Sequence, residues 1–208
     1  MQTKRAYKFR FYPDQQQEKL LTQTFGCVRY VYNSILRYRT DAYDQTQEKI
    51  GYMGANARLT AIKKLPESLF LNEVSSVPLQ QCLRSQQTAF KNFFEGRAKY
   101  PVFKSKKHRQ SAEFTYRAFT FKNGELKLAK CEQPLAIKWS QTLPSDPTTI
   151  TVSKDQAGRY FVSCLCEFDA TLLPITDNKA KRKVARIHAK IADCRSDNLH
   201  KLSRKLIN

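Results

Sequence analysis

The chain has 208 residues and a formal net charge of +19, with 37 Lys and Arg against 18 Asp and Glu. A hydrophobic content of 41%, with 13 Phe and 10 Tyr, argues against intrinsic disorder, and no stretch approaches the length of a membrane span. So large a positive excess is typical of proteins that bind nucleic acid, because neutralising phosphates releases condensed counterions. A ribosomal or architectural role would produce the same excess.

The N-terminal segment MQTKRAYKFRFYP lacks the apolar region of a signal peptide. We therefore expect a cytoplasmic protein that associates with the nucleoid through DNA. Six Cys are scattered along the chain without a CxxC pair or a Cys/His array at zinc spacing, so we predict no disulfides and no structural metal. Cys164 and Cys166 fall on one side of a predicted strand, where we expect small buried thiols.

The first predicted element is a strand from Arg5 to Tyr12, in which aromatic and basic residues alternate. Asp14 and Gln17 form a capping-box pattern for a helix that runs to about residue 45. One apolar stripe follows this helix through Leu21, Phe25, Val28, Tyr32 and Ile35. Gly26 inside it costs about 1 kcal/mol relative to Ala, so we expect a close packing contact there.

A second helix is predicted over 55 to 65. A third begins at Ser75-Ser76-Val77-Pro78 and ends before Gly96. Leu79, Leu83, Phe90 and Phe94 mark its expected apolar face. Residues 97 to 111 then form a basic loop that includes Tyr100 and Phe103.

The rest of the chain up to residue 168 predicts short strands, with tight turns at Asn123-Gly124 and Ala157-Gly158. The strand candidates are 113 to 116, 119 to 122, 125 to 129, 135 to 139, 149 to 154 and 159 to 168. Because one more strand precedes the helices, we expect an α+β fold, a small β-barrel into which a helical bundle is inserted. A long basic amphipathic helix, with apolar positions at 184, 187, 191, 194, 199, 202 and 206, closes the chain.

Candidate nucleic-acid contacts lie in the first helix and in the basic loop. Arg29 suits a phosphate or a base edge, whereas Tyr30 and Asn33 could equally serve internal hydrogen bonds. The loop cations that can meet phosphates are Lys99, Lys104, Lys106, Lys107 and Arg109. Tyr100 or Phe103 could stack on a base, although Phe103 could instead anchor the core.

The closing helix contributes a further row of cations: Arg182, Lys183, Arg186, Lys190, Arg195, Lys201 and Arg204. Such a helix could also lie on an anionic membrane or simply face solvent, but it has no aromatic residue at its apolar edge, which favours nucleic acid. Asp169 and Asp177 come closest to a nuclease carboxylate, and the sequence pattern does not place a second carboxylate beside either to share a metal ion. We therefore predict no catalytic residue and no bound metal.

Five segments occur in this order along the chain: FGCVRYVYN, VPLQQCLRSQQTAFKNFF, YPVFKSKK, GRYFVSCLCE and ARIHAKIADCRSDNLHKLSRKL. Together they resemble the TnpB (OrfB) family encoded by insertion sequences. The resemblance implies a compact RNA-guided DNA endonuclease related to type V CRISPR effectors. It also implies a wedge barrel, an inserted recognition lobe and a RuvC-like nuclease domain, with contacts to guide RNA or target DNA from Arg29, Tyr30, Asn33, Lys104, Lys106 and Lys107.

This chain departs from the family pattern after Leu173-Pro174, where the family has a RuvC strand with a catalytic Asp. We expect an internally deleted and truncated copy, with Mg²⁺ and structural Zn²⁺ bound only by the full-length family. The expected parts are 1–13, the first barrel strand; 14–96, the recognition lobe; 97–173, the rest of the barrel; and 174–208, a linker and basic helix left from an incomplete RuvC-like domain.

The expected function is therefore binding of guide RNA and double-stranded target DNA without cleavage, with no membrane or small-molecule partner. Three alternatives remain open. The chain could be a regulator that blocks transcription by binding alone, an active endonuclease if segments are missing from the sequence, or a decayed remnant that binds any nucleic acid weakly.

Overall fold

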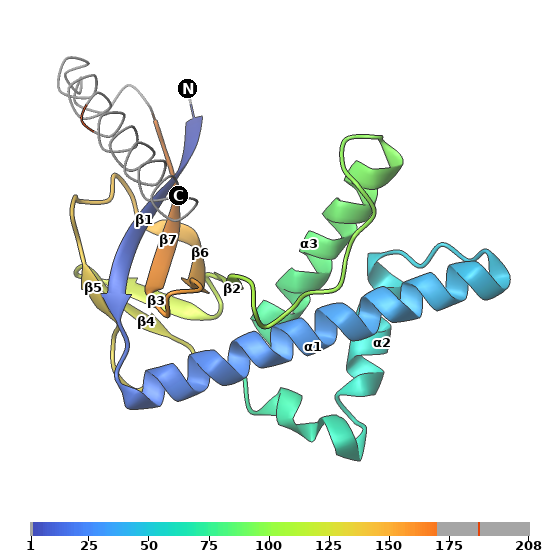
Figure 1. The fold of residues 1–208 in the computed structure, drawn as a ribbon. Helices are drawn as coiled ribbons and strands as arrows, with labels where there is room; N and C mark the ends of the chain where they lie inside the picture. The colour runs from blue at the N-terminus through green and yellow to red at the C-terminus, as the bar shows by residue number, and fades with distance from the viewer. Residues whose placement is uncertain (1, 170–186, 188–208) are drawn as a thin grey trace, which may run out of the picture. The chain divides into compact units, whose positions relative to one another are not determined.

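The computed structural model describes residues 2 to 169 and Ile187, and Gln2–Phe168 form one compact unit (Figure 1). Apart from Ile187, the predicted segment 174 to 208, with its basic helix over 179 to 208, lies outside the described residues.

The compact unit mixes helices and strands, as the sequence predicts. The first strand is β1 (Gln2–Tyr12). Four helical elements follow it: α1 (Gln15–Thr46), α2 (Tyr52–Ile62), the 3-10 helix η1 (Pro66–Asn72) and α3 (Ser76–Phe94). The remaining strands are β2 (Gln110–Thr115), β3 (Phe119–Lys122), β4 (Glu125–Leu128), β5 (Ala136–Lys138), β6 (Pro147–Lys154) and β7 (Tyr160–Asp169). A helical block is therefore inserted between the first strand and the others.

The strands form a five-stranded sheet in the order β2-β6-β7-β1-β5 and a separate hairpin of β3 and β4. Antiparallel ladders join β2 to β6, β6 to β7 and β1 to β5. Among the described strands no ladder joins β2 to β5, so this sheet is open and the expected barrel is not confirmed. The Asn123-Gly124 turn is confirmed, because both residues have positive φ, 52° and 80°, as a tight two-residue hairpin requires.

The predicted alternation along β1 is confirmed: Phe9 and Phe11 are buried, whereas Lys8 and Arg10 are exposed. Trp139 contacts Phe9 with ring centroids 4.7 Å apart. Its second aromatic neighbour is Phe121, at 6.0 Å, which attaches the β3–β4 hairpin to the sheet.

The predicted buried thiols on β7 are also confirmed, because Cys164 and Cys166 are fully buried. Burial raises the pKa of the Cys164 thiol to about 12. At neutral pH this side chain therefore stays uncharged and packs as a small apolar group.

Helix α1 begins with the predicted capping box. The Gln17 amide donates to Asp14 Oδ1 at 2.8 Å, and the Asp14 amide donates to Gln17 Oε1 at 3.3 Å. Every residue of the predicted stripe is buried. The expected packing contact at Gly26 is wrong: a Cβ built there would meet no atom within 4 Å.

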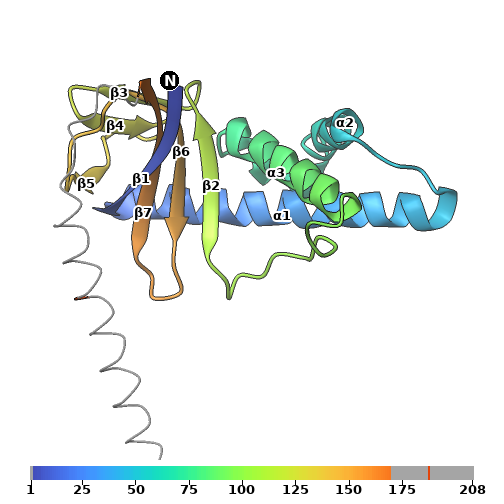
Figure 2. The ribbon, with the colours of Figure 1, turned by 90° about the horizontal axis from the view of Figure 1, so that it is seen from above.

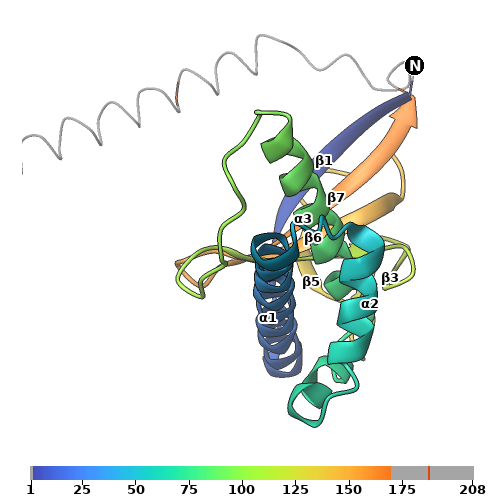
Figure 3. The same cartoon turned by 90° about the vertical axis from the view of Figure 1, so that its right-hand side faces the viewer.

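Helix α3 crosses α1 and packs against it, and α2 packs against both (Figures 2 and 3). At the crossing, buried Gln86 donates from Nε2 to the Tyr32 carbonyl oxygen at 2.9 Å. Ser75 caps α3, and Gly96 at φ 69° follows its end, as predicted. The expected apolar face stops short of that end, because Phe94 is 64% exposed.

We expect Gly26→Ala to raise the free energy of unfolding by about 0.5 to 1 kcal/mol, because Ala loses less conformational entropy in a helix and meets no clash. Urea unfolding followed by circular dichroism measures this. The control is Gly96→Ala: Gly96 also has open space but sits at positive φ, so the same substitution should destabilise. Equal effects at the two positions would contradict the argument.

A second prediction concerns Glu18, which ties the start of α1 to the sheet. Its Oε1 accepts from Lys154 Nζ at 3.1 Å and from the Tyr160 hydroxyl at 2.9 Å. The hydrogen bonds from Lys154 and Tyr160 and the Lys154 charge lower the pKa of Glu18, so its contribution to stability is present above the unfolded-state pKa and is lost as pH falls through the folded-state pKa.

We expect Glu18→Gln to lower the unfolding midpoint at pH 7. At acidic pH the variant should match the unsubstituted chain, because Glu18 is then protonated in both the folded and the unfolded state. Thermal melts across that pH range test it. A difference that persists unchanged at acidic pH would show that the carboxylate charge is not responsible.

Candidate nucleic-acid interface

One α1 side chain pairs directly with the backbone of the basic loop between α3 and β2. Asn33 donates from Nδ2 to the Lys104 carbonyl oxygen at 3.0 Å and accepts at Oδ1 from the Lys104 amide at 2.8 Å. Its amide thus pairs with both backbone groups of Lys104, as a neighbouring strand would. The internal hydrogen bonds that the sequence left open for Asn33 are therefore present.

Lys104 and Arg29 line a cavity of about 350 Å³ between α1 and the loop, together with Arg109. Arg29 Nη1 donates to Gln110 Oε1 at 3.0 Å. Lys104 as a whole is exposed, yet its ammonium lies 4.4 Å from the centroid of the Tyr32 ring, and burial there lowers its pKa. The fold thus brings Arg29 on α1 together with two loop cations that lie more than 70 positions later in the sequence.

The loop itself presents further cations to solvent. Residues 97 to 109 contain six Lys or Arg and no Asp or Glu. Lys99, Lys106 and Lys107 are all exposed. The sequence allowed Phe103 either to anchor the core or to stack on a base. Phe103 is 61% exposed, so it does not anchor the core, and its ring is accessible to a partner.

The side chains of Tyr30 and Arg109 both make polar contacts inside the protein. The Tyr30 hydroxyl lies 3.2 Å from Ser68 Oγ, and its ring contacts Phe70 with centroids 5.4 Å apart. Arg109 donates from Nη2 to Ser153 Oγ at 3.2 Å, which places its guanidinium over the outer face of the sheet. Tyr30 is 39% exposed, so part of its ring also faces solvent.

The sheet face that carries Lys8 and Arg10 adds cations that are not among the candidate contacts expected from the sequence. Lys8 Nζ lies 4.2 Å from the centroid of the Phe161 ring, and the Arg10 guanidinium lies 5.1 Å from that of Tyr12. Lys138 approaches the same Tyr12 ring at 5.7 Å. The period-two alternation of β1 could have identified Lys8 and Arg10, because it separates them from the buried Phe side chains.

The seven cations predicted on the closing helix, from Arg182 to Arg204, lie outside the described residues. Within the described part of the chain, no group of three or more His, Cys, Asp or Glu side chains could hold a metal ion. The same part contains no helix long and apolar enough to cross a membrane. What the described geometry offers is a basic surface with exposed aromatic rings.

Two relatives align with almost the whole chain. One, from Streptomyces pristinaespiralis, is named as a candidate RNA-guided DNA endonuclease; it is 46% identical over 99% of this chain and 65% of its own length. The other, from Escherichia coli K12, is named as a candidate RNA-guided DNA endonuclease InsQ; it is 27% identical over 98% of this chain and 63% of its own length. The chain spans less than two thirds of either relative.

Both alignments contain more positions than the chain has residues, 260 and 259 against 208. The relatives therefore carry internal residues opposite gaps in this chain. A solved structure, the cryo-EM complex of Cas12f1 with single guide RNA and target DNA, aligns with 98% of this chain and 64% of its own at 10% identity; its TM-score of 0.38 is too low to support an argument.

A family model described as the helix-turn-helix domain of OrfB proteins of the IS605 type matches residues 1–48. In the structure these residues form β1 and the single uninterrupted helix α1, so the matched segment contains one helix and no turn between two. The family model matches the segment that contains Arg29 and Asn33. Together with the 46% identity over nearly the full chain, it shows that this protein belongs to the TnpB (OrfB) family of insertion-sequence proteins.

Proposed function

We propose that this chain binds a guide RNA and a double-stranded target DNA, as the nucleic-acid-binding portion of an RNA-guided DNA endonuclease. The observation that carries the proposal is the convergence of Arg29, Lys104 and Arg109 on one cavity, beside a loop with six cations and no acids. Such a surface binds phosphates without local competition from carboxylates. The names of the two relatives support RNA and DNA as the polyanions.

In this proposal the helical block has the role of a recognition lobe and the strands that of a wedge. The loop cations contact the phosphate backbone, while the exposed ring of Phe103 offers a stacking plane for an unpaired base. Arg29 is the strongest candidate for a base-edge contact, because a guanidinium can donate two parallel hydrogen bonds.

The proposal further holds that the chain binds without cleaving. Its acidic residues include none in a D-x-G setting, and the described residues contain no cluster of metal ligands. The relatives' names favour a second candidate, RNA-guided cleavage of DNA. The decisive experiment is to co-express the chain with the RNA from the end of its own element, purify it, and add target DNA with and without Mg²⁺.

Retention of one discrete RNA, with guide-dependent binding of DNA and no cleavage, is the expected result. Guide-dependent cleavage in Mg²⁺ would overturn the non-cleaving part of the proposal. If the purified chain retains heterogeneous RNA or none, the guide-dependent function itself fails and a nonspecific basic surface remains.

We expect the double variant Lys106→Gln and Lys107→Gln to reduce the slope of log Kd against log salt by about 1.4 on single-stranded RNA, because each lost phosphate contact removes about 0.7. Fluorescence anisotropy at several salt concentrations measures the slope. Lys63→Gln with Lys64→Gln makes the same change in net charge away from the loop and should leave the slope nearly unaltered. Equal reductions for both pairs would show that net charge alone governs binding.

Asn33→Ala should act differently, because it removes no charge. We expect faster hydrogen exchange at the Lys104 amide and a few-fold weaker RNA binding at an unchanged salt slope, since the loop must be ordered on binding. Asn56→Ala on α2 is the matched control. Exchange at Lys104 that stays slow in the Asn33 variant would contradict the role given to this amide.

A further inference from the structure

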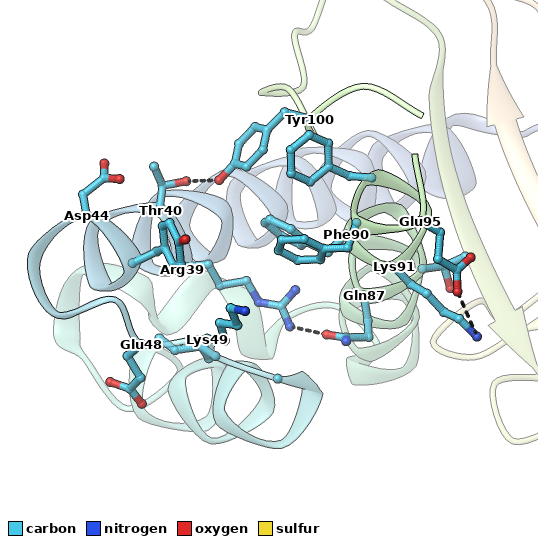
Figure 4. A pocket seen from close by; sticks show the side chains of 16 residues that line it. Arg39, Thr40, Asp44, Glu48, Lys49, Gln87, Phe90, Lys91, Glu95 and Tyr100 are labelled. Carbon is cyan, nitrogen blue, oxygen red and sulfur yellow. Dashed lines mark hydrogen bonds and ion pairs between the residues drawn. The ribbon is translucent and has the colours of Figure 1, made fainter. Parts of the chain in front are cut away.

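A second cavity lies apart from the one that Arg29, Lys104 and Arg109 line. It measures about 800 Å³ and is formed by the C-terminal half of α1, the end of α3, residues 48 to 51 and Tyr100 (Figure 4). Aromatic and aliphatic side chains dominate its lining: Tyr43, Ile50, Phe90, Phe93, Phe94 and Tyr100. Phe94 is 64% exposed and Tyr43 is 43% exposed, so flat ring faces are accessible from solvent.

A buried guanidinium forms part of the cavity wall. Arg39 is only 4% exposed, and its Nη2 donates to Gln87 Oε1 at 2.9 Å (Figure 4). Its guanidinium lies 5.1 Å from the centroid of the Phe90 ring. Within the described structure, its Nε–H has no hydrogen-bond acceptor. A buried donor without an acceptor is unfavourable, and Arg39 lines the cavity, so a small shift of its guanidinium toward an occupant's acceptor would gain a hydrogen bond that the empty cavity lacks.

Tyr100 connects this cavity to the candidate interface. Its ring meets the rings of Phe90 and Phe93 edge-on, with centroids 5.6 and 5.2 Å away, and its hydroxyl lies 2.8 Å from Thr40 Oγ1. Tyr100 belongs to the same loop as Lys104. Along α1, Arg39 lies six residues beyond Asn33, which is about 9 Å at the helical rise. A nucleic-acid strand on the loop could therefore reach the cavity.

The chemistry of the cavity favours a base over its competitors. A phosphate gains little net attraction, because the walls carry three acids as well as three cations: Asp44, Glu48 and Glu95 against Arg39, Lys49 and Lys91. An aliphatic side chain would cover the Arg39 donor without pairing it and offers no π face to the rings. An unstacked nucleobase offers both a π face for the rings and a ring nitrogen or carbonyl that can accept from the guanidinium.

We propose that this cavity holds an unstacked nucleobase with its sugar, stacked on Phe94 and accepting a hydrogen bond from Arg39. The inference rests on the proposed nucleic-acid function and adds a site to it. The base would come from the strand whose phosphates lie along the basic loop. Because stacking is nearly independent of salt, this contact should contribute affinity that persists at high salt.

The test compares two fluorescein-labelled probes of the same length, a 12-nucleotide single-stranded RNA and a fully abasic oligomer with the same number of phosphates. We expect Phe94→Leu to weaken binding of the RNA about tenfold and to leave binding of the abasic oligomer unchanged. Phe94→Tyr keeps a flat ring and should restore the affinity. Tyr116→Leu, at an aromatic residue that is 68% exposed and outside the cavity, is the matched control.

Two results would overturn the base site. If Phe94→Leu binds both probes as the unsubstituted chain does, the cavity contributes nothing to nucleic-acid binding. If light scattering shows a dimer that Phe94→Leu converts to a monomer, with RNA affinity unchanged, the cavity is a contact between two copies. In either case the salt dependence of the Lys106 and Lys107 variant still reports on the proposed function, so the two failures are distinguishable.

Discussion

The continuity of α1 is the constraint on which the rest of this structure depends. Thirty-two residues form one helix, about 48 Å long at the helical rise, with no break between the sheet and the helical block. Its first turn is fixed to the connection between β4 and β5: Gln17 is 4% exposed and donates from Nε2 to the carbonyl oxygens of Gln133 and Pro134, at 3.2 and 3.1 Å. Further along, Asn33 holds the basic loop, and Arg39 contacts α3. A rigid helix therefore sets the spacing between the interface and the aromatic cavity.

Sequence reasoning was accurate where local interactions determine the structure. The Asp14 cap, the buried stripe of α1 and the Asn123-Gly124 turn follow from backbone hydrogen bonds and from periodicity within a few residues. The strands were also predicted in the observed order, with ends displaced by up to a few residues. For example, β1 begins at Gln2 rather than at Arg5. These features can be predicted without knowing which elements pack against one another.

The failures share a different cause, because each depends on contacts across long stretches of chain. Phe94 fits the apolar spacing of α3, yet it extends beyond the point where α1 and α2 cover that helix. Arg39 is charged but buried, since Gln87 and the Phe90 ring receive its guanidinium. Periodicity predicted neither. The pairing of Asn33 with Lys104, 71 positions later, was likewise beyond reach, although the sequence did identify both residues as site candidates.

The described cations are positioned largely by aromatic rings, and this has a consequence for binding. Lys8 lies over Phe161, Arg84 over Tyr52 and Lys104 over Tyr32, each with its charge 4.2 to 4.9 Å from the ring centroid. A ring attracts a cation through its quadrupole without cancelling the charge, whereas a carboxylate partner would neutralise it. Aromatic positioning therefore orders the side chain and leaves its full charge to attract a phosphate.

The same physics separates the two parts of the surface. Exposed cations of the loop attract any polyanion, and that attraction falls steeply as salt rises. The cavity beside Arg39 is lined by as many acidic as basic side chains, so it has no net charge for such attraction and offers instead stacking area and one unpaired donor. In the proposal, the contribution of the loop to affinity responds to salt, whereas that of the cavity responds to the presence of an unstacked base. Because α1 contacts both the basic loop and the cavity, a nucleic-acid strand bound at the loop would be held in position for the cavity.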